Sequence, residues 1–299
     1  MHLVIGPSSL ALGRQLEIAL SVPALEAKLQ IFPDGESCCR AELPDDGAPV
    51  VIVHGTHAPQ DRHIQQLCQL IEVATGRRRR EIVCVVPYFA YARQDRRVVP
   101  GDPLSAQLVV KTLLALGATQ IITVDIHNPK IFDTCASFAT SLSAALPTAD
   151  WLRTQRIGNP LLVSPDHGSE RRIRAIGKEL GWPVHVCDKR KDETGRTWYE
   201  GIGRGLAGHD AIVIDDLCSS GSTLVPLAGA LREAGAKKLL IGITHFFADP
   251  VAVEKKIGAG VELFSTNSIP SEISKVDLAP MLANYIQNYL SPGRQRASI

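Results

Sequence analysis

Short apolar runs alternate with segments of helical spacing along almost the whole chain, and this alternation constrains the fold more than any other feature. Between two of the runs, for example, Val109, Leu113 and Leu116 recur as on one face of a helix. Apolar strands that alternate with helices are typical of parallel sheets covered on both faces. The chain is therefore predicted to adopt a doubly wound α/β fold. The apolar runs are residues 3–5, 50–53, 82–86, 121–124, 161–163, 211–214 and 239–243.

The length of 299 residues allows two domains, and a weak internal repeat supports that division. Residues 105–127 and 222–245 each contain a helical pattern, a Gly-Ala pair and an apolar run that closes on a histidine. The pattern breaks near residues 145–150, so we expect two related α/β domains, residues 1–147 and 148–299. Because glycine commonly follows helices, a chance similarity of two βα units is the alternative.

The stretch most informative about function follows the apolar run at residues 211–214. Asp215 and Asp216 come directly after the run, and a loop of hydroxyl residues and glycine leads from them into a helix. The N–H groups and the dipole at a helix start attract anions, and glycine allows close approach. Two carboxylates repel a phosphate unless they bind sugar hydroxyls or Mg²⁺, so the stretch predicts a site for a phosphorylated sugar. The loop residues are Ser219, Ser220, Gly221, Ser222 and Thr223.

Other nucleotide-site motifs do not explain this stretch. The Gly-Lys-Ser/Thr end of a Walker A loop does not follow it, and the Gly-x-Gly-x-x-Gly pattern of dinucleotide sites is absent at this turn. A structural turn, in which Asp and Ser only cap the helix, is the alternative interpretation.

A second polar segment, residues 87–97, combines three aromatic residues with three arginines and Gln94. Aromatic faces stack on nucleobases, and Arg or Gln side chains bind a base edge or phosphates. A surface loop anchored by its aromatics is the alternative. Residues 32–36 are interpreted as a turn around an Asp-Gly pair, and its carboxylates, Asp34 and Glu36, are further candidates for ligand contact.

Three more strand ends carry polar residues. His127 and Asp166 each follow an apolar run, and ligands of open α/β sheets bind at such carboxyl ends. Aspartate and neutral histidine together suit a divalent cation whose other positions are filled by phosphate oxygens and water. Lys189, Arg190 and Lys191 follow another run, and three cations at a strand end are suited to clamp a polyphosphate. A structural hydrogen bond or a solvated loop is the alternative for each.

Composition and charge exclude several classes of protein. A net charge of +1 gives no overall attraction to nucleic acid or membranes, and the four arginines at residues 77–80 are expected at a solvated helix end. No apolar stretch reaches the roughly 18 residues of a membrane helix. Seven cysteines without a Cys-x-x-Cys pair are typical of reduced thiols, and no secretory signal opens the chain. We therefore expect a cytoplasmic protein without nucleic-acid or membrane partners.

These segments, in the order in which they follow one another along the chain, resemble the ribose-phosphate pyrophosphokinase family over nearly the whole chain. Residues 87–96, Pro-Tyr-Phe-Ala-Tyr-Ala-Arg-Gln-Asp-Arg, are specific to that family, and residues 215–223 are similar to its phosphoribosyl-binding loop. Members contain two related doubly wound parallel-sheet domains of phosphoribosyltransferase type. They transfer the diphosphoryl group of ATP to O1 of ribose 5-phosphate, which gives 5-phosphoribosyl 1-diphosphate and AMP. The resemblance therefore implies ATP and ribose 5-phosphate as ligands and Mg²⁺ as cofactor.

The resemblance also implies roles for residues that match the family's motifs. The residues implied to bind ATP are Asp34, Glu36, Arg93, Gln94, Asp95 and Arg96. The residues implied to lie at the Mg²⁺–ATP site are His127 and Asp166. The residues implied to bind ribose 5-phosphate are Asp215 and Asp216 through the sugar hydroxyls, and Ser219, Ser220, Gly221, Ser222 and Thr223 through the phosphate. The implied catalytic cations are Lys189, on a mobile loop, with Arg190 and Lys191.

Some positions depart from the family pattern. Ser219 stands where many members have Asp, Ser222 where many have Gly, and Lys191 where bacterial-type members often have a second arginine. Residues 41–48 are unlike the part that builds the ADP regulatory site, so we expect no strong ADP allostery and a closer similarity to archaeal-type members. Members form dimers or hexamers, which implies a homo-oligomer. A type I phosphoribosyltransferase and a non-catalytic regulatory subunit are the alternatives on the same fold.

Overall fold

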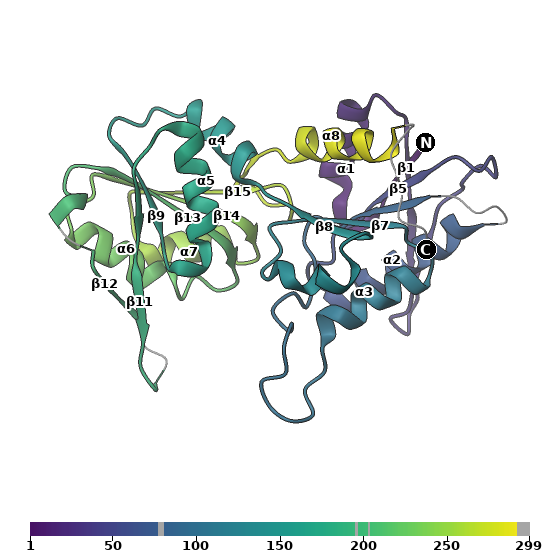
Figure 1. Cartoon of the computed structure of the whole chain (residues 1–299), viewed down its shortest axis with the longest axis horizontal. Helices are drawn as coiled ribbons and strands as arrows, with labels where there is room; N and C mark the ends of the chain where they lie inside the picture. The colour runs from purple at the N-terminus through teal and green to yellow at the C-terminus, as the bar shows by residue number, and fades with distance from the viewer. Residues whose placement is uncertain (77–80, 195–196, 203, 292–299) are drawn as a thin grey trace. The chain divides into compact units, whose positions relative to one another are not determined.

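The computed structural model describes residues 1–76, 81–194, 197–202 and 204–291, which form two compact units. The four-arginine run at residues 77–80 lies outside the described residues. Unit 1 contains residues 1–142 and 268–270 together with helix α8 (Ala279–Leu290), and unit 2 contains residues 143–267 and 271–277. The expected domains divided the chain at residue 147 and gave its end to the second domain. Helix α8 instead packs on α1 (Leu10–Leu20) of unit 1 (Figure 1).

Unit 1 is built on a six-stranded sheet with the strand order β2-β1-β5-β6-β7-β8, in which all neighbouring strands are parallel. Helices α1 and α8 cover one face, and α2 (Gln60–Thr75) and α3 (Ser105–Ala115) cover the other (Figure 1). An antiparallel hairpin joins β3 (Lys28–Ile31) and β4 (Ser37–Arg40). The sheet strands are β1 (His2–Ile5), β2 (Ala24–Glu26), β5 (Val50–Val53), β6 (Ile82–Val85), β7 (Gln120–Val124) and β8 (Ala139–Leu142).

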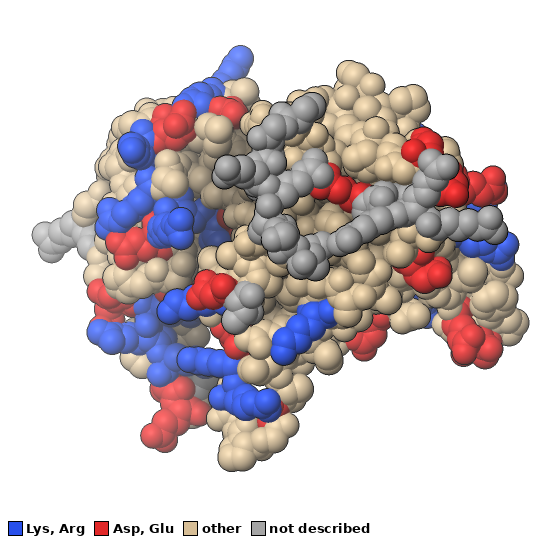
Figure 2. Space-filling model, turned by 45° about the vertical axis from the view of Figure 1, so that its right-hand side comes forward, with Lys and Arg blue, Asp and Glu red and all other residues tan. Residues whose placement is uncertain are grey.

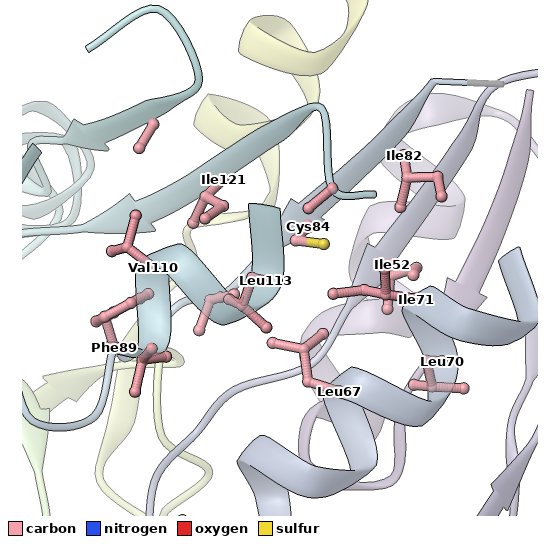
Figure 3. Packing of buried hydrophobic residues seen from close by; sticks show 14 of the residues in the cluster. Ile52, Leu67, Leu70, Ile71, Ile82, Cys84, Phe89, Val110, Leu113 and Ile121 are labelled. Atoms are coloured by element: carbon pink, nitrogen blue, oxygen red, sulfur yellow. The ribbon is translucent and has the colours of Figure 1, made fainter. Parts of the chain in front are cut away.

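The core of unit 1 shows why these residues form a doubly wound sheet. Leu67 and Ile71 of α2 and Leu113 of α3 pack against Ile52 and Cys84, which lie on two adjacent central strands (Figure 3). The central strands are buried on both faces of the sheet, so the side chains that point to either face are apolar. The predicted alternation of apolar strands and amphipathic helices is confirmed here.

Unit 2 repeats this architecture with the strand order β10-β9-β13-β14-β15-β16, again with parallel neighbours. Helices α4 (Ala145–Arg153) and α5 (Glu170–Leu180) pack on one face, and α6 (Leu224–Glu233) and α7 (Pro250–Ile257) pack on the other. The sheet strands are β9 (Pro160–Ser164), β10 (Val184–Val186), β13 (Asp210–Cys218), β14 (Lys238–Phe246), β15 (Val261–Thr266) and β16 (Ser274–Val276). The predicted pair of doubly wound parallel-sheet domains is confirmed.

The segments that we matched as an internal repeat are not equivalent in the fold. The shared strand order makes β13 correspond to β5 and β14 to β6, so that α6 corresponds to α2 and not to α3. The pairing of residues 105–127 with 222–245 is therefore wrong by one βα unit. Both stretches have a helix, a positive-φ glycine and a buried parallel strand, which consecutive βα units share. In addition, β7 ends at Val124, before His127, and α6 begins at Leu224, after Ser222.

Two predicted strand ends also differ in the structure. The strand expected at residues 211–214 continues through Asp215 and Asp216 to the end of β13, because β14 is equally long and supplies partners as far as Phe246. The cations expected on a loop lie in β11 (Asp188–Lys191), which pairs with β12 (Thr197–Glu200) in an antiparallel hairpin. This hairpin extends away from the sheet of unit 2 (Figure 1).

Charge is spread in patches of both signs. On the face that Figure 2 shows, Lys and Arg side chains lie close to Asp and Glu side chains, in agreement with the net charge of +1. Within the described part of the chain, the helices are too short or too polar to cross a membrane.

Candidate functional site

Two adjacent aspartates form the centre of the candidate site in unit 2. The backbone N–H of Asp216 donates to Oδ1 of Asp215 at 2.9 Å, and the same oxygen accepts a 2.6 Å hydrogen bond from the hydroxyl of Ser169. Burial, followed by the neighbouring charge of Asp216, raises the pKa of Asp215 to about 7. The two carboxyl groups therefore carry less than two full negative charges near neutral pH, which reduces their repulsion toward a phosphate.

The hydroxyl-rich loop lies between β13 and α6. Gly221 has a φ of +78°, a conformation that residues with a side chain rarely adopt, and a Cβ there would lie 3.2 Å from Val253. The N–H of Leu224 closes the turn by donating to the Gly221 carbonyl at 3.0 Å. The exposed hydroxyls of Ser220 and Ser222 lie 3.3 Å apart. These hydroxyl groups stand at a helix start, where a phosphate is electrostatically favoured.

The β11–β12 hairpin separates the predicted catalytic cations onto two faces. Successive side chains of a strand point to opposite faces, so Lys189 and Arg190 point in opposite directions. Nζ of Lys189 lies 3.4 Å from Oδ2 of Asp166, and Nε of Arg190 donates to Glu200 at 3.0 Å. Lys191 shares the face of Lys189 by the same alternation. The structure thus brings Lys189 to Asp166 and directs Arg190 to the partner strand.

Asp166 begins a short turn after β9. Its Oδ1 accepts a hydrogen bond of 2.9 Å from the N–H of Gly168, which fixes the carboxylate. His167, in the same turn, contacts the carboxylates of Glu170 at 2.9 Å and Asp188 at 3.3 Å. Hydrogen bonds to these two carboxylates raise the pKa of His167. The turn therefore ties the end of β9 to the first residue of the hairpin.

The same turn supplies two site residues that the sequence did not identify. Ser169 carries the hydroxyl that reaches Asp215, and Nη1 of Arg172 donates to that hydroxyl oxygen at 3.2 Å. Ser169 is buried and Arg172 is on the first part of α5. No sequence pattern predicts this contact, because Ser169 and its carboxylate partner are 46 residues apart in the chain.

The aromatic and arginine-rich segment of unit 1 follows β6. Tyr88 and Phe89 are only 9% and 2% exposed, and Phe89 packs edge-on against Phe132 with ring centroids 5.9 Å apart. Tyr88 and Phe89 therefore do not offer free ring faces for stacking on a nucleobase, because both rings are buried in the protein. The hydroxyl of Tyr91 donates to Asp61.

The polar residues of this segment remain at the surface. Arg93, Gln94 and Arg96 are exposed. Asp95 accepts a hydrogen bond from the side-chain amide of Asn128, and that bond holds the pKa of Asp95 below its ordinary value. This hydrogen bond shows that the segment after β6 lies close to the residues that follow β7. Asn128 was not singled out from the sequence.

The second group of candidate nucleotide residues lies in the β3–β4 hairpin of unit 1. Gly35 has a φ of +93°, and Oδ1 of Asp34 accepts a 3.1 Å hydrogen bond from the N–H of Glu36. The predicted turn is confirmed. Both carboxylates are exposed at its tip.

Two family models match this chain and define its class. Residues 127–280 match the model described as the phosphoribosyl transferase domain. Residues 1–117 match the model described as the N-terminal domain of ribose phosphate pyrophosphokinase. Two parallel-sheet units, one with an aspartate pair beside a phosphate-type loop, agree with a protein of the phosphoribosyl transferase class.

Individual relatives narrow this class. The ribose-phosphate pyrophosphokinase of Methanopyrus kandleri is 31% identical over 93% of this chain and 95% of its own length. The ribose-phosphate pyrophosphokinase of Bacillus caldolyticus is 30% identical over 93% of this chain and 91% of its own length. The crystal structure of phosphoribosylpyrophosphate synthetase from Mycobacterium smegmatis shares the fold, with a TM-score of 0.84, 24% identity, and coverage of 98% and 99%. The chain belongs to the ribose-phosphate pyrophosphokinase family.

Proposed function

We propose that this protein transfers the diphosphoryl group of ATP to O1 of ribose 5-phosphate, giving 5-phosphoribosyl 1-diphosphate and AMP. The observation that carries the proposal is the 3.4 Å approach of Lys189 to Asp166 in the unit that holds the aspartate pair and the phosphate-type loop. A cation and a carboxylate beside a sugar-phosphate site suit the handling of a polyphosphate donor. A type I phosphoribosyltransferase, which consumes the product, has no need of this cation.

The residues of unit 2 would position ribose 5-phosphate. Asp215 and Asp216 hold the sugar hydroxyls, and their hydrogen-bonded geometry fixes the ring orientation. The 5-phosphate binds at residues 219–223, where exposed hydroxyls and the start of α6 favour an anion. Anchoring the sugar at both ends presents O1 in one orientation, and orientation contributes much of the catalysis in phosphoryl-type transfer.

The cationic residues would stabilise the charge that develops during transfer. Lys189 is the principal candidate, because its ammonium group faces Asp166 and is only partly exposed. Lys191 shares its face, whereas Arg190 contributes after a change of partner from Glu200. The ATP-binding residues that we propose for unit 1 are Asp34, Glu36, Arg93, Gln94, Asp95 and Arg96.

A magnesium ion fits the donor set of this chain as a partner of the triphosphate. No three His, Cys, Asp or Glu side chains of the described residues gather into a cage that would hold a metal by themselves. Mg²⁺ usually binds through one or two carboxylates together with phosphates and water, so Asp166 and His127 are suitable protein contributions. When bound, Mg²⁺ neutralises phosphate charge.

The cysteines and the oligomeric state concern the compartment and the assembly of the protein. All seven cysteines, each in a described segment, are free thiols, which fits a reducing cytoplasm. We propose a homo-oligomer, a dimer or hexamer, which sedimentation of the purified protein would identify.

The test is a turnover assay with ATP, Mg²⁺ and ribose 5-phosphate, with the nucleotides separated afterwards. Equal amounts of AMP and 5-phosphoribosyl 1-diphosphate are expected, without free ADP. Formation of no AMP would reject the proposal. Release of diphosphate from 5-phosphoribosyl 1-diphosphate in the presence of a base would instead support the transferase. Binding of ATP without turnover at high protein concentration would support the regulatory subunit.

A further inference from the structure

Tyr199 joins the hairpin that carries Lys189 to the phosphate-type loop. It lies in β12 directly opposite Lys189 of β11, so the two side chains point to the same face. The Tyr199 hydroxyl donates a 3.1 Å hydrogen bond to the backbone carbonyl of Thr223, and its ring packs against the core of unit 2. One side chain thus connects the hairpin with the end of the loop.

The bond from Tyr199 holds a peptide group that is central to the loop. The peptide between Thr223 and Leu224 accepts from Tyr199 through its carbonyl, and its N–H donates to the carbonyl of Gly221 at 3.0 Å. Its orientation therefore depends on both the hairpin and the loop. A phosphate that binds hydroxyl and N–H groups of residues 219–223 would restrain the turn to which this peptide belongs.

The hydroxyl of Tyr199 stays a donor at neutral pH. Burial, followed by the negative charges of Asp166 and Asp215, raises the pKa of Tyr199. The Tyr199 side chain lies on the same face of the hairpin as Lys189, and the ammonium group of Lys189 lies 3.4 Å from Asp166.

We propose that Tyr199 is a positioning residue through which ribose 5-phosphate, bound at residues 219–223, fixes the hairpin and holds Lys189 beside Asp166. This inference rests on the proposed function for the identity of the ligand. The ion pair between Lys189 and Asp166 is partly exposed, and such pairs contribute little to order by themselves. The part-buried hydrogen bond from the Tyr199 hydroxyl to a fixed backbone carbonyl supplies the directional restraint that the ion pair lacks.

The test uses Tyr199→Phe in the full chain, because phenylalanine keeps the packed ring and removes only the hydroxyl. Trp198→Phe is the matched control, since Trp198 is the neighbouring aromatic residue on the opposite face of the hairpin, where it contacts Glu200 at 3.2 Å. Trp198 is also 41% exposed, so its fluorescence reports on the position of the hairpin. Subtracting the emission of Trp198→Phe isolates this signal from the other tryptophans.

Adding ribose 5-phosphate without ATP is expected to change the Trp198 emission of the wild type, and Tyr199→Phe is expected to lose most of that change. Its ribose 5-phosphate affinity, measured by calorimetry, should fall less than about threefold, while kcat falls about three- to tenfold, as for one lost hydrogen bond. Trp198→Phe should keep wild-type kcat.

Three results would overturn the coupling: no change of Trp198 emission in the wild type, an undiminished emission change in Tyr199→Phe, or a kcat of Tyr199→Phe equal to that of Trp198→Phe. Absence of turnover in the wild type would overturn the proposed reaction alone, because the emission response to ribose 5-phosphate is measured without ATP.

Discussion

Ser169 donates a 2.6 Å hydrogen bond from its hydroxyl to Oδ1 of Asp215, and the two residues lie on different elements of unit 2. This bond favours the ionised form of Asp215, whereas burial and Asp216 oppose it. The protonation of the aspartate pair is therefore adjusted by a residue from another strand end.

Ser169→Ala should raise the pKa of Asp215 further, because the mutation removes a donor to its carboxylate. If ribose 5-phosphate requires the ionised pair, the acidic limb of its binding profile will move to higher pH by about half a unit to one unit. Calorimetric titrations over a range of pH measure the midpoint. Ser164→Ala is the control, since that hydroxyl donates to the backbone carbonyl of Asp166. An unmoved midpoint in Ser169→Ala would contradict the role of the bond.

The stability of the ligand-free protein should fall as pH rises toward 7, in part because of Asp215. Folding raises the pKa of Asp215 from 3.8 to about 7, so between these values the folded chain keeps a proton that the unfolded chain has released. The stabilisation is complete below 3.8 and is lost as pH rises through about 7.

The asparagine of Asp215→Asn cannot ionise. Between about pH 5 and 7.5 the unfolding free energy of this variant should therefore fall by less than that of the wild type, and the two decreases should differ by at least about 1 kcal/mol. Denaturant unfolding at several pH values measures this difference. Asp249→Asn, at the start of α7, is a suitable control because asparagine also caps helices. Parallel pH dependences of the wild type and Asp215→Asn would show that this carboxyl group titrates normally.

Lys189→Ala should lower kcat by on the order of 10²-fold or more, because its charge acts mainly in the transition state. ATP binding should persist, as judged by calorimetry. Lys178→Ala, which removes an exposed lysine of α5 in the same unit, should keep wild-type turnover. Unchanged turnover of Lys189→Ala would remove this residue from the mechanism.

Asp216→Asn should mainly weaken ribose 5-phosphate, since a carboxylate accepts two sugar hydroxyls better than an amide does. The backbone N–H of Asp216 still reaches Asp215 in the variant, so the local strand geometry is kept. The KM for ribose 5-phosphate is expected to rise about tenfold, as for a hydrogen bond to a charged group. A change confined to the KM for ATP would mean that the carboxylate serves the other ligand.

Much of the architecture could be predicted because its signals are local. Buried parallel strands require continuous apolar runs, and the central runs at residues 50–53 and 82–86 correspond to β5 and β6 almost residue for residue. Short edge strands such as β2 and β16 have a mixed composition and were not predicted from the sequence. Residues 215–223 also gave a local signal, since the acids and the loop are consecutive in the chain.

Other features depend on which strands become neighbours. Strand order decides that Ser169 reaches Asp215 and that α6 is the counterpart of α2, and the separate β11–β12 hairpin brings Tyr199 to Thr223. The pairing of β11 with β12 decides that Lys189 faces Asp166 while Arg190 faces Glu200. The sequence by itself determined the class of fold and the chemical types in the site, because periodicity and motif are properties of neighbouring residues. Only the tertiary structure decided their partners, because a side-chain hydrogen bond forms over about 3 Å of space whatever the distance along the chain.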